Sequence, residues 1–305
     1  MRILLVGQAA FAEKVLEGLL QAGDEIAAVV CPPDKGDKPD PVKSAALAHW
    51  IPVHQFPSLK RPEARAAFEQ ARADLALLAY VTQIVPESLL DVPRLGTLCF
   101  HPSLLPRYRG GSAIPWQLIN GETRTGVTVF WTDAGIDTGP ILLQREAVAG
   151  PDDTAGSLYY QTLFPLGVQT CLDAVALVRA GNAPRIVQDD RVATYDPLLT
   201  DTHAAIDWAR PAPVLHDLIR GCDPSPGAHT RWQGKTLRLF DPRRSTGSAG
   251  GAAPGTVVAL DADGIAVATA DGVVRCKRLR ADGPKAAASE VAAALGLSAG
   301  ARLGS

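Results

Sequence analysis

A histidine follows a short apolar run in the first half of the sequence. Residues 97–100, TLCF, have the composition of a buried strand, and His101 comes directly after them. In open α/β sheets ligands bind outside the carboxyl ends of the strands, so an imidazole at this place can act as an acid or a base. Side chains two apart along a strand share a face, which puts Cys99 on the same face as His101.

A carboxylate is expected near this histidine. A second β-branched run, residues 127–131, leads into TDAGIDTG, where Gly135 and Gly139 flank Asp137 and allow backbone geometries that other residues resist. A carboxylate beside an imidazole orients the ring and raises its affinity for a proton. We expect His101 and Asp137, at two adjacent strand ends, to form an acid/base pair. By spacing alone, a structural histidine would fit the same pattern.

The elements around these residues alternate between strand and helix. Alternation of this kind predicts a Rossmann-like α/β domain with a mostly parallel sheet and helices on both faces. The first strand and turn, VGQAAFAEKV, lack the glycine pattern of dinucleotide-binding folds. We expect strands at 2–6, 25–31, 74–79 and 96–101, and helices at 10–20, 41–50, 62–71 and, interrupted at Pro165, 151–180.

The pattern changes after about residue 200. A helix at 212–220 is followed by short β-prone runs at 227–240, 255–261, 264–269 and 273–280, with a flexible loop at 245–254. Closely spaced short strands indicate a small OB-like β-barrel. We therefore predict two domains, residues 1–203 and residues 204–305.

Composition narrows the class of protein. The chain has 305 residues, 47% of them hydrophobic, and a formal net charge of −2, which gives no electrostatic footprint for nucleic acid or an anionic membrane. Five widely spaced cysteines without a CxxC pair predict reduced thiols in a cytoplasmic protein and no metal site. We read the N-terminus as a strand and an amphipathic helix, not a signal peptide, and expect no segment that spans a membrane.

Two strings together resemble a known family. HPSLLPRYRG at 101–110, followed by D-x-G-x-D-T-G at 133–139, closely resembles the signature of the folate-dependent formyltransferases. That family includes methionyl-tRNA formyltransferase, glycinamide ribonucleotide transformylase and the hydrolase domain of 10-formyltetrahydrofolate dehydrogenase. The string IDW…IRG…PGA is similar to the start of the family's C-terminal domain, so the resemblance covers nearly the whole chain.

The resemblance implies a substrate and a site. The formyl donor is 10-formyltetrahydrofolate, without a metal, and attack on its formyl carbon builds an oxyanion. His101 is implied to donate to this oxyanion, while Asp137 holds the histidine and relays protons through water. The folate is implied to lie against the loop after residue 79, the loop after His101 and the loop around Asp137, with the following candidate binding residues: Tyr80, Gln83, Ser103, Leu104, Leu105, Pro106, Asp133, Gly135 and Ile136.

The third candidate catalytic residue, Cys99, stands where transferases of the family carry an asparagine aimed at the same oxygen. A thiol is a weak donor, so we expect little oxyanion stabilisation from it. It is either an inert small side chain or a nucleophile that takes the formyl group as a thioester. The hydrolase domain of the dehydrogenases also has an apolar residue here, and the 31–41 loop, CPPDKGDKPDP, is shorter and less basic than in the tRNA enzymes.

These departures favour the dehydrogenase-type branch of the family. The expected acceptor is water or a small amine, with methionyl-tRNA as an alternative. A different class remains open, a folate-binding protein that leaves 10-formyltetrahydrofolate unchanged, although the presence of both His101 and Asp137 argues against it.

Overall fold

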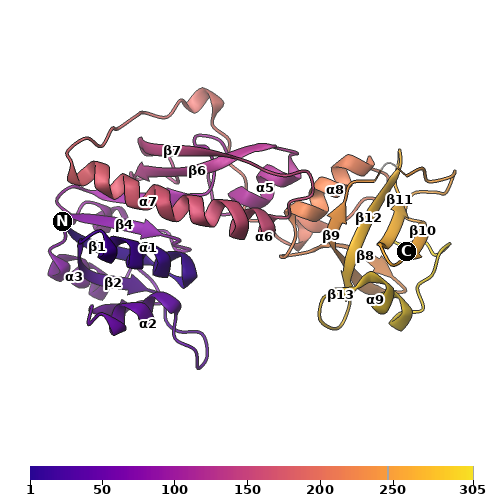
Figure 1. Cartoon of the computed structure of the whole chain (residues 1–305), viewed down its shortest axis with the longest axis horizontal. Helices are drawn as coiled ribbons and strands as arrows, with labels where there is room; N and C mark the ends of the chain where they lie inside the picture. Colours follow the sequence, from indigo (N-terminus) through magenta and orange to yellow (C-terminus); the bar gives the residue numbers. More distant parts are fainter. Residues whose placement is uncertain (246, 305) are drawn as a thin grey trace. The chain divides into compact units, whose positions relative to one another are not determined.

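The computed structural model describes residues 1–245 and 247–304, so Thr246 in the expected 245–254 loop and the terminal Ser305 lie outside the described residues. The chain divides into two compact units (Figure 1). Unit 1 comprises Met1–Gly111, Gly126–Ala147 and Gln161–Asp196, and unit 2 comprises Ser112–Thr125, Val148–Tyr160 and Pro197–Ser305. The predicted boundary at 203/204 stays a prediction.

Unit 1 is built on one seven-stranded sheet with the order β3-β2-β1-β4-β5-β6-β7. Neighbouring strands from β3 to β5 run parallel, and β6 runs antiparallel to β5. The chain leaves β1 toward β3 on one side and returns to β4 on the other, which places a topological switch point between β1 and β4. The strands are β1 (Arg2–Gly7), β2 (Glu25–Cys31), β3 (Val53–Gln55), β4 (Leu75–Ala79), β5 (Thr97–His101), β6 (Arg124–Trp131) and β7 (Ile141–Val148).

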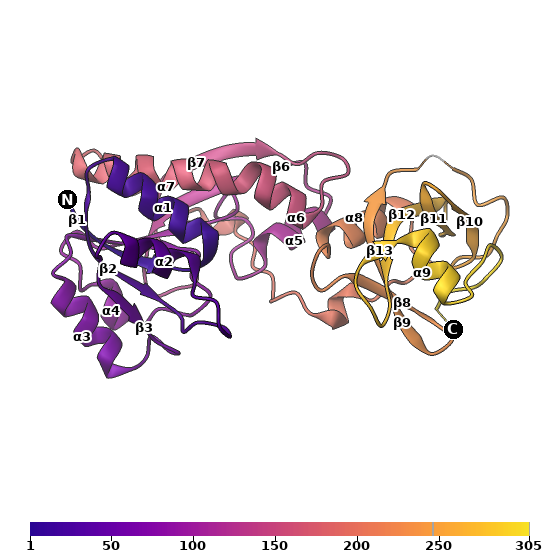
Figure 2. The same cartoon turned by 60° about the horizontal axis from the view of Figure 1, so that its bottom comes forward.

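Helices cover both faces of this sheet, as Figure 2 shows for α1 and α7 on one side and α3 on the other. Phe11 of α1 stacks on Phe100 of β5 with ring centroids 4.4 Å apart, whereas Phe68 of α3 packs on the opposite face with Leu4 and Leu78. The predicted Rossmann-like architecture is confirmed. The helical elements of this part of the chain are α1 (Ala9–Gln21), α2 (Pro41–Ala48), α3 (Pro62–Ala71), α4 (Glu87–Leu90), α7 (Phe164–Arg179) and the 3₁₀ turn η2 (Asp190–Val192).

The expected interruption of the long helix occurs next to Pro165. A π-helical turn, η1 (Tyr159–Leu163), separates α6 (Ala155–Leu158) from α7, and Pro165 occupies the first turn of α7, where a missing N–H costs little. Within the described residues, the run Ala155–Arg179 is long and apolar enough to cross a membrane by length and composition, which the sequence prediction did not anticipate. The side chains that are buried along α7 include Cys171 and Val175.

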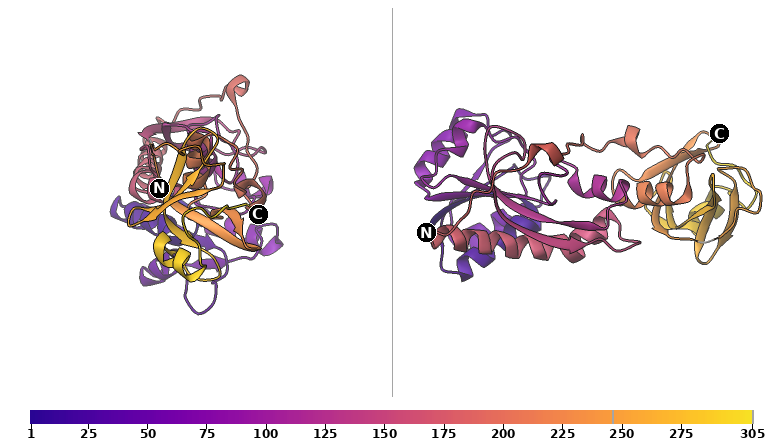
Figure 3. Two further views of the ribbon diagram at one scale, coloured as in Figure 1. Left: turned by 90° about the vertical axis from the view of Figure 1, so that its right-hand side faces the viewer. Right: turned by 90° about the horizontal axis from the view of Figure 1, so that it is seen from above.

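Unit 2 contains a curved antiparallel sheet with the order β10-β11-β12-β9-β8, and β13 pairs with β12. Its strands, orange to yellow in Figure 3, form a curved sheet. The hydrophobic core of this unit includes Trp208 and Leu239. The chain segment 300–304 bridges the two edge strands, because it bonds to Val257 of β10 and Arg231 of β8. The elements are α5 (Ala113–Ile119), η3 (Asp201–Ala204), α8 (Ala212–Gly221), β8 (Ala228–Trp232), β9 (Lys235–Arg243), β10 (Val257–Asp261), β11 (Gly264–Ala268), β12 (Val273–Arg280), β13 (Ala286–Ala287) and α9 (Ala288–Ala294).

A buried charge cluster lies on α8. Arg220, 1% exposed, donates to Asp217 Oδ1 at 2.7 Å, and His216 lies 3.1 Å from Asp152 and 3.5 Å from Asp217. Burial alone would raise the pKa of the Asp217 carboxyl, but the hydrogen bond from His216 and the charge of Arg220 outweigh it and hold the pKa below its usual range. The pKa of Asp152 is lowered in the same way, against burial, by bonds from the Arg244 amide and His216.

The depressed pKa values predict loss of stability in acid. The unfolded chain takes up protons at Asp217 and Asp152 near pH 3.9, whereas the folded cluster resists protonation to lower pH. We therefore expect the free energy of unfolding to hold above about pH 5 and to fall as the pH drops below about 4. Urea denaturation followed across pH 3–7 measures this, and a stability that rises on acidification would contradict it.

Candidate active site

His101 ends β5 and is 5% exposed. Its Nε2 lies 2.7 Å from the carbonyl oxygen of Tyr108, and because a carbonyl can only accept, the hydrogen-bond partner assigns a proton to Nε2. In the neutral ring Nδ1 is then an unprotonated acceptor. Tyr108 has a left-handed φ of 60°, which is costly for a residue with a side chain and is held here by the surrounding loop.

Asp137 lies on the other side of the imidazole. Its Oδ2 is 3.5 Å from His101 Nδ1 and accepts a hydrogen bond of 2.8 Å from the Gly110 amide. The first distance exceeds that of a normal N–H···O hydrogen bond. When Nδ1 is protonated, its N–H therefore interacts only weakly with Asp137 and can also donate to a second acceptor. The two predicted side chains therefore do meet, with the aspartate side chain 16% exposed.

The route by which they meet differs from the prediction. β6 is antiparallel to β5, with Trp131 opposite Leu98 and Thr128 opposite His101. The end of β6 thus lies level with the start of β5, and the expectation of two adjacent strand ends was wrong. The loop between β6 and β7 folds back and carries Asp137 to the histidine.

The glycines of this loop allow neighbouring parts of the chain to come closer than a side chain would permit. A Cβ on Gly135 would lie 2.0 Å from Thr138 Oγ1, and one on Gly139 would lie 1.7 Å from the carbonyl oxygen of Trp131. The residue with a left-handed φ is Asp137 itself, at 56°. Asp133 stabilises the loop by accepting bonds from the Gly135 amide at 3.0 Å and from Thr138 Oγ1 at 2.6 Å.

The loop after His101 is fastened to the sheet. Ser103 is fully buried and donates to the Arg107 carbonyl at 2.7 Å, and Thr128 Oγ1 donates to the Ser103 carbonyl at 2.6 Å. Leu105 is buried as well, its amide donates to Thr128 Oγ1, and its carbonyl accepts from Gln144 Nε2. The polar groups of Ser103 and Leu105 thus hold the loop, whereas Leu104 and Pro106 are partly exposed.

Cys99 is half-buried and packs against Leu105, Phe130 and Ile141. Burial, reinforced by the nearby charge of Asp137, raises the pKa of its thiol well above the usual range. A thiol in this environment stays protonated at neutral pH and is a poor nucleophile.

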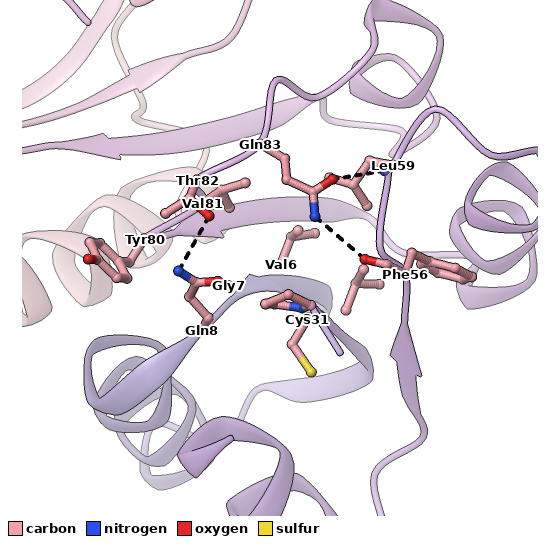
Figure 4. Close-up of a pocket in the computed structure, with 12 residues that line it drawn as sticks. Val6, Gly7, Gln8, Cys31, Phe56, Leu59, Tyr80, Val81, Thr82 and Gln83 are labelled. Carbon is pink, nitrogen blue, oxygen red and sulfur yellow. Dashed lines mark hydrogen bonds between the residues drawn. The ribbon is translucent and has the colours of Figure 1, made fainter. Parts of the chain in front are cut away.

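A small, open pocket lies at the switch point. Residues of β1, β2 and the segment after β4 line it, including Tyr80 and Gln83 (Figure 4). Gln83 faces the 56–59 segment, where its Oε1 accepts from the Leu59 amide at 3.0 Å. Tyr80 is 42% exposed. The lining includes neither His101 nor Asp137, so the candidate binding residues fall into separate groups. Ile136, 44% exposed, belongs to the loop that carries Asp137.

The turn after β1 is already bonded to a carboxylate. The Ala9 amide, at the start of α1, donates to both oxygens of Asp40 at 2.9 and 3.0 Å. Asp40 also accepts from the Val42 amide and so caps α2. The negative charge of Asp40 at the start of α1 would repel a phosphate group. This agrees with the absence of the dinucleotide-binding glycine pattern from the sequence after β1.

Two residues that contact the site were not among the candidates proposed from the sequence. Gln188, 7% exposed, follows α7, and its Nε2 donates to the carbonyls of Asp137 at 2.9 Å and Gly139 at 2.7 Å. Its Oε1 accepts from Arg109, whose guanidinium also pairs with Asp190 at 2.7 Å. Arg109 stands inside the quoted string, but nothing in the sequence marks Gln188. Among residues 1–245 and 247–304, no group of three or more His, Cys, Asp or Glu side chains is placed to hold a metal.

Comparisons with known proteins agree with this architecture. A formyl transferase profile matches residues 1–171, and a profile of the formyl transferase C-terminal domain matches residues 198–295. Methionyl-tRNA formyltransferase of Geobacter metallireducens is 39% identical over 309 residues, which cover 99% of this chain and 98% of that protein. Cytosolic 10-formyltetrahydrofolate dehydrogenase of Xenopus tropicalis is 42% identical over 245 residues, 79% of this chain and 27% of that protein.

Among solved structures, HypX from Aquifex aeolicus in complex with tetrahydrofolic acid aligns with a TM-score of 0.70 at 19% identity, over 96% of this chain and 47% of that one. At this identity the likeness concerns the fold. The alignment with the dehydrogenase spans about a quarter of that protein's length.

The fold defines a class: α/β proteins with an open, mostly parallel sheet followed by a small antiparallel β-domain. Within that class the chain belongs to the formyltransferase family, because the family profile covers more than half of it and a relative matches it from end to end.

Proposed function

We propose that this chain removes the formyl group from 10-formyltetrahydrofolate and that methionyl-tRNA accepts it. The observation that supports methionyl-tRNA as the acceptor is the end-to-end match to a methionyl-tRNA formyltransferase. The match to the dehydrogenase covers only about a quarter of that protein. This reverses the order that the sequence favoured, in which water or a small amine came first.

The His101–Asp137 arrangement supports the chemistry. His101 Nε2 donates a hydrogen bond to the Tyr108 carbonyl, so Nδ1 is the ring atom that takes up or releases a proton. Protonated Nδ1 donates to the oxyanion that forms when the acceptor attacks the formyl carbon. The Asp137 carboxylate, 3.5 Å from Nδ1, stabilises the imidazolium and receives, through water, the proton that the attacking amine loses.

Tyr80, Gln83, Ile136 and the partly exposed part of the 102–106 loop are proposed folate contacts. They offer an aromatic ring, an amide and apolar side chains, which suit a flat heterocycle. A cytoplasmic location is proposed as well, supported by five free thiols and by the absence of disulfides among them.

Water is a second candidate acceptor. Cys99 favours it, because the position where transferases of the family carry an amide donor holds a neutral thiol packed among apolar side chains. Weak oxyanion stabilisation at this place is also expected of a hydrolase domain of the dehydrogenase type.

One experiment separates these possibilities. Purified protein is incubated with 10-formyltetrahydrofolate alone, then with small amines, then with charged methionyl-tRNA, while tetrahydrofolate, formate and formyl-methionyl-tRNA are measured. Formylated tRNA supports the proposal. Formate released without an acceptor identifies a hydrolase, and tight folate binding without turnover identifies a non-catalytic binding protein.

The thiol of Cys99 is not expected to carry the formyl group. Cys99→Ala should retain kcat for formyl removal within about 3-fold, because a protonated thiol contributes as a small apolar side chain. Steady-state kinetics with 10-formyltetrahydrofolate measure this. A loss as large as that caused by removing His101 would establish the thioester route.

A further inference from the structure

A segment remote from both sequence motifs fastens the two loops of the candidate site. Its start pairs with β7, where Ile141 and Ile186 exchange backbone hydrogen bonds of 2.8 and 2.9 Å. Its end pairs with the loop after His101, where the Arg109 amide donates to the Thr194 carbonyl at 3.0 Å and the Thr194 amide donates to the Pro106 carbonyl at 3.2 Å. The segment 186–196 is therefore hydrogen-bonded to the start of β7, which follows the Asp137 loop, and to the loop after His101.

We propose that Gln188 is a positioning residue that sets the place of Asp137 relative to His101. The inference rests on the proposed function. Its amide nitrogen donates to the carbonyls of Asp137 and Gly139, on either side of Thr138, and thereby fixes the backbone on which the catalytic carboxylate stands.

The same side chain reaches the histidine loop through Arg109. Gln188 Oε1 accepts from Arg109 Nε at 3.2 Å and Nη2 at 2.8 Å. On either side of Arg109, the Tyr108 carbonyl accepts from His101 and the Gly110 amide donates to Asp137. One buried amide thus ties the orienting groups of the histidine to the backbone of the aspartate.

The backbone conformation of Asp137 requires stabilisation by hydrogen bonds of this kind. Its φ of 56° is unfavourable for a residue with a Cβ, and the preceding residues 133–136 are exposed. Without the two bonds from Gln188 the loop is free to relax, and the gap between Oδ2 and Nδ1 would widen. A displacement of about 1 Å at a catalytic group can cost on the order of 10²-fold in rate.

The test uses Gln188→Ala and Gln188→Glu in the full chain. The carboxylate introduced by the second variant keeps an acceptor for Arg109 but cannot donate to the two carbonyls, so this variant serves if the alanine variant fails to fold. Both variants should lower kcat by roughly 30-fold and leave KM for 10-formyltetrahydrofolate within about 3-fold. Gln169→Ala is the matched control, because Gln169 bonds to Asp173 at 3.0 Å on the exposed side of α7 in the same unit.

A double-mutant cycle with Asp137→Asn distinguishes positioning from general support of the fold. If Gln188 acts through Asp137, adding Gln188→Ala to the Asp137→Asn variant should cost less than about 3-fold more. Losses that multiply, or a Gln188→Glu variant with the wild-type kcat, would overturn the inference. Absence of turnover in the wild-type chain with every acceptor would instead overturn the proposed function.

Discussion

Alanine in place of His101 is expected to lower kcat for formyl removal by about 10³-fold, at the middle of the range for a lost acid/base group. The imidazole is the group whose Nδ1 can deliver a proton to the oxyanion, whereas the groups on either side of it, the Tyr108 carbonyl and the Asp137 carboxylate, are acceptors. KM for 10-formyltetrahydrofolate should change little, because the buried ring contributes little surface to a ligand.

Steady-state rates of tetrahydrofolate formation measure the effect. His49→Ala is the control, since His49 is an exposed histidine at the end of α2. If the His101 variant kept more than about a tenth of the wild-type rate, general acid catalysis would have to come from another group.

Removing the charge of Arg220 is expected to destabilise unit 2 by about 3–5 kcal/mol. Arg220 is 1% exposed, and its guanidinium bonds to Asp217 and to the Gly150 carbonyl. Arg220→Met fills a similar volume but leaves the half-buried Asp217 carboxylate without its cation. The cost therefore arises mainly from an uncompensated charge.

Urea denaturation of the full chain, followed by tryptophan fluorescence, gives the free energy of unfolding. Arg231→Met is the matched control, because Arg231 is exposed on β8 and its side chain bonds only to the Gly234 carbonyl at 3.2 Å in the described structure. The double variant Arg220→Met with Asp217→Leu should recover part of the loss. Equal effects of the Arg220 and Arg231 variants would show that the buried cluster contributes little.

The order of elements was readable from the sequence because apolar runs and breakers are local signals. Pro62 opens α3 and Pro165 marks the break in the long helix, both as expected. The run at 227–240 is instead two strands, because Gln233 and Gly234 take left-handed φ values and form a hairpin turn. β7 and α9 were missed, since Ile141–Val148 ends in charged residues and Ala288–Ala294 is rich in alanine.

The meeting of His101 and Asp137 was readable for a different reason. The strings around His101 and Asp137 resemble a family signature, and the side chains meet at 3.5 Å. The path of the loop between them was not readable, because strand direction depends on pairing between distant segments. Gln188 stands in a polar string, IVQDDRVATY, without periodicity, so only the folded chain reveals that its amide reaches the Asp137 backbone.

The segment 186–196 also bears on how the protein is made. A ribosome releases the chain from its N-terminus, so β5, the His101 loop and the Asp137 loop all emerge before Gln188. The sheet can begin to assemble early, whereas the two loops lack the contacts that fasten them until translation has passed Thr194. A newly synthesised chain therefore lacks the hydrogen bonds that hold the His101 and Asp137 loops together until the segment 186–196 has been released.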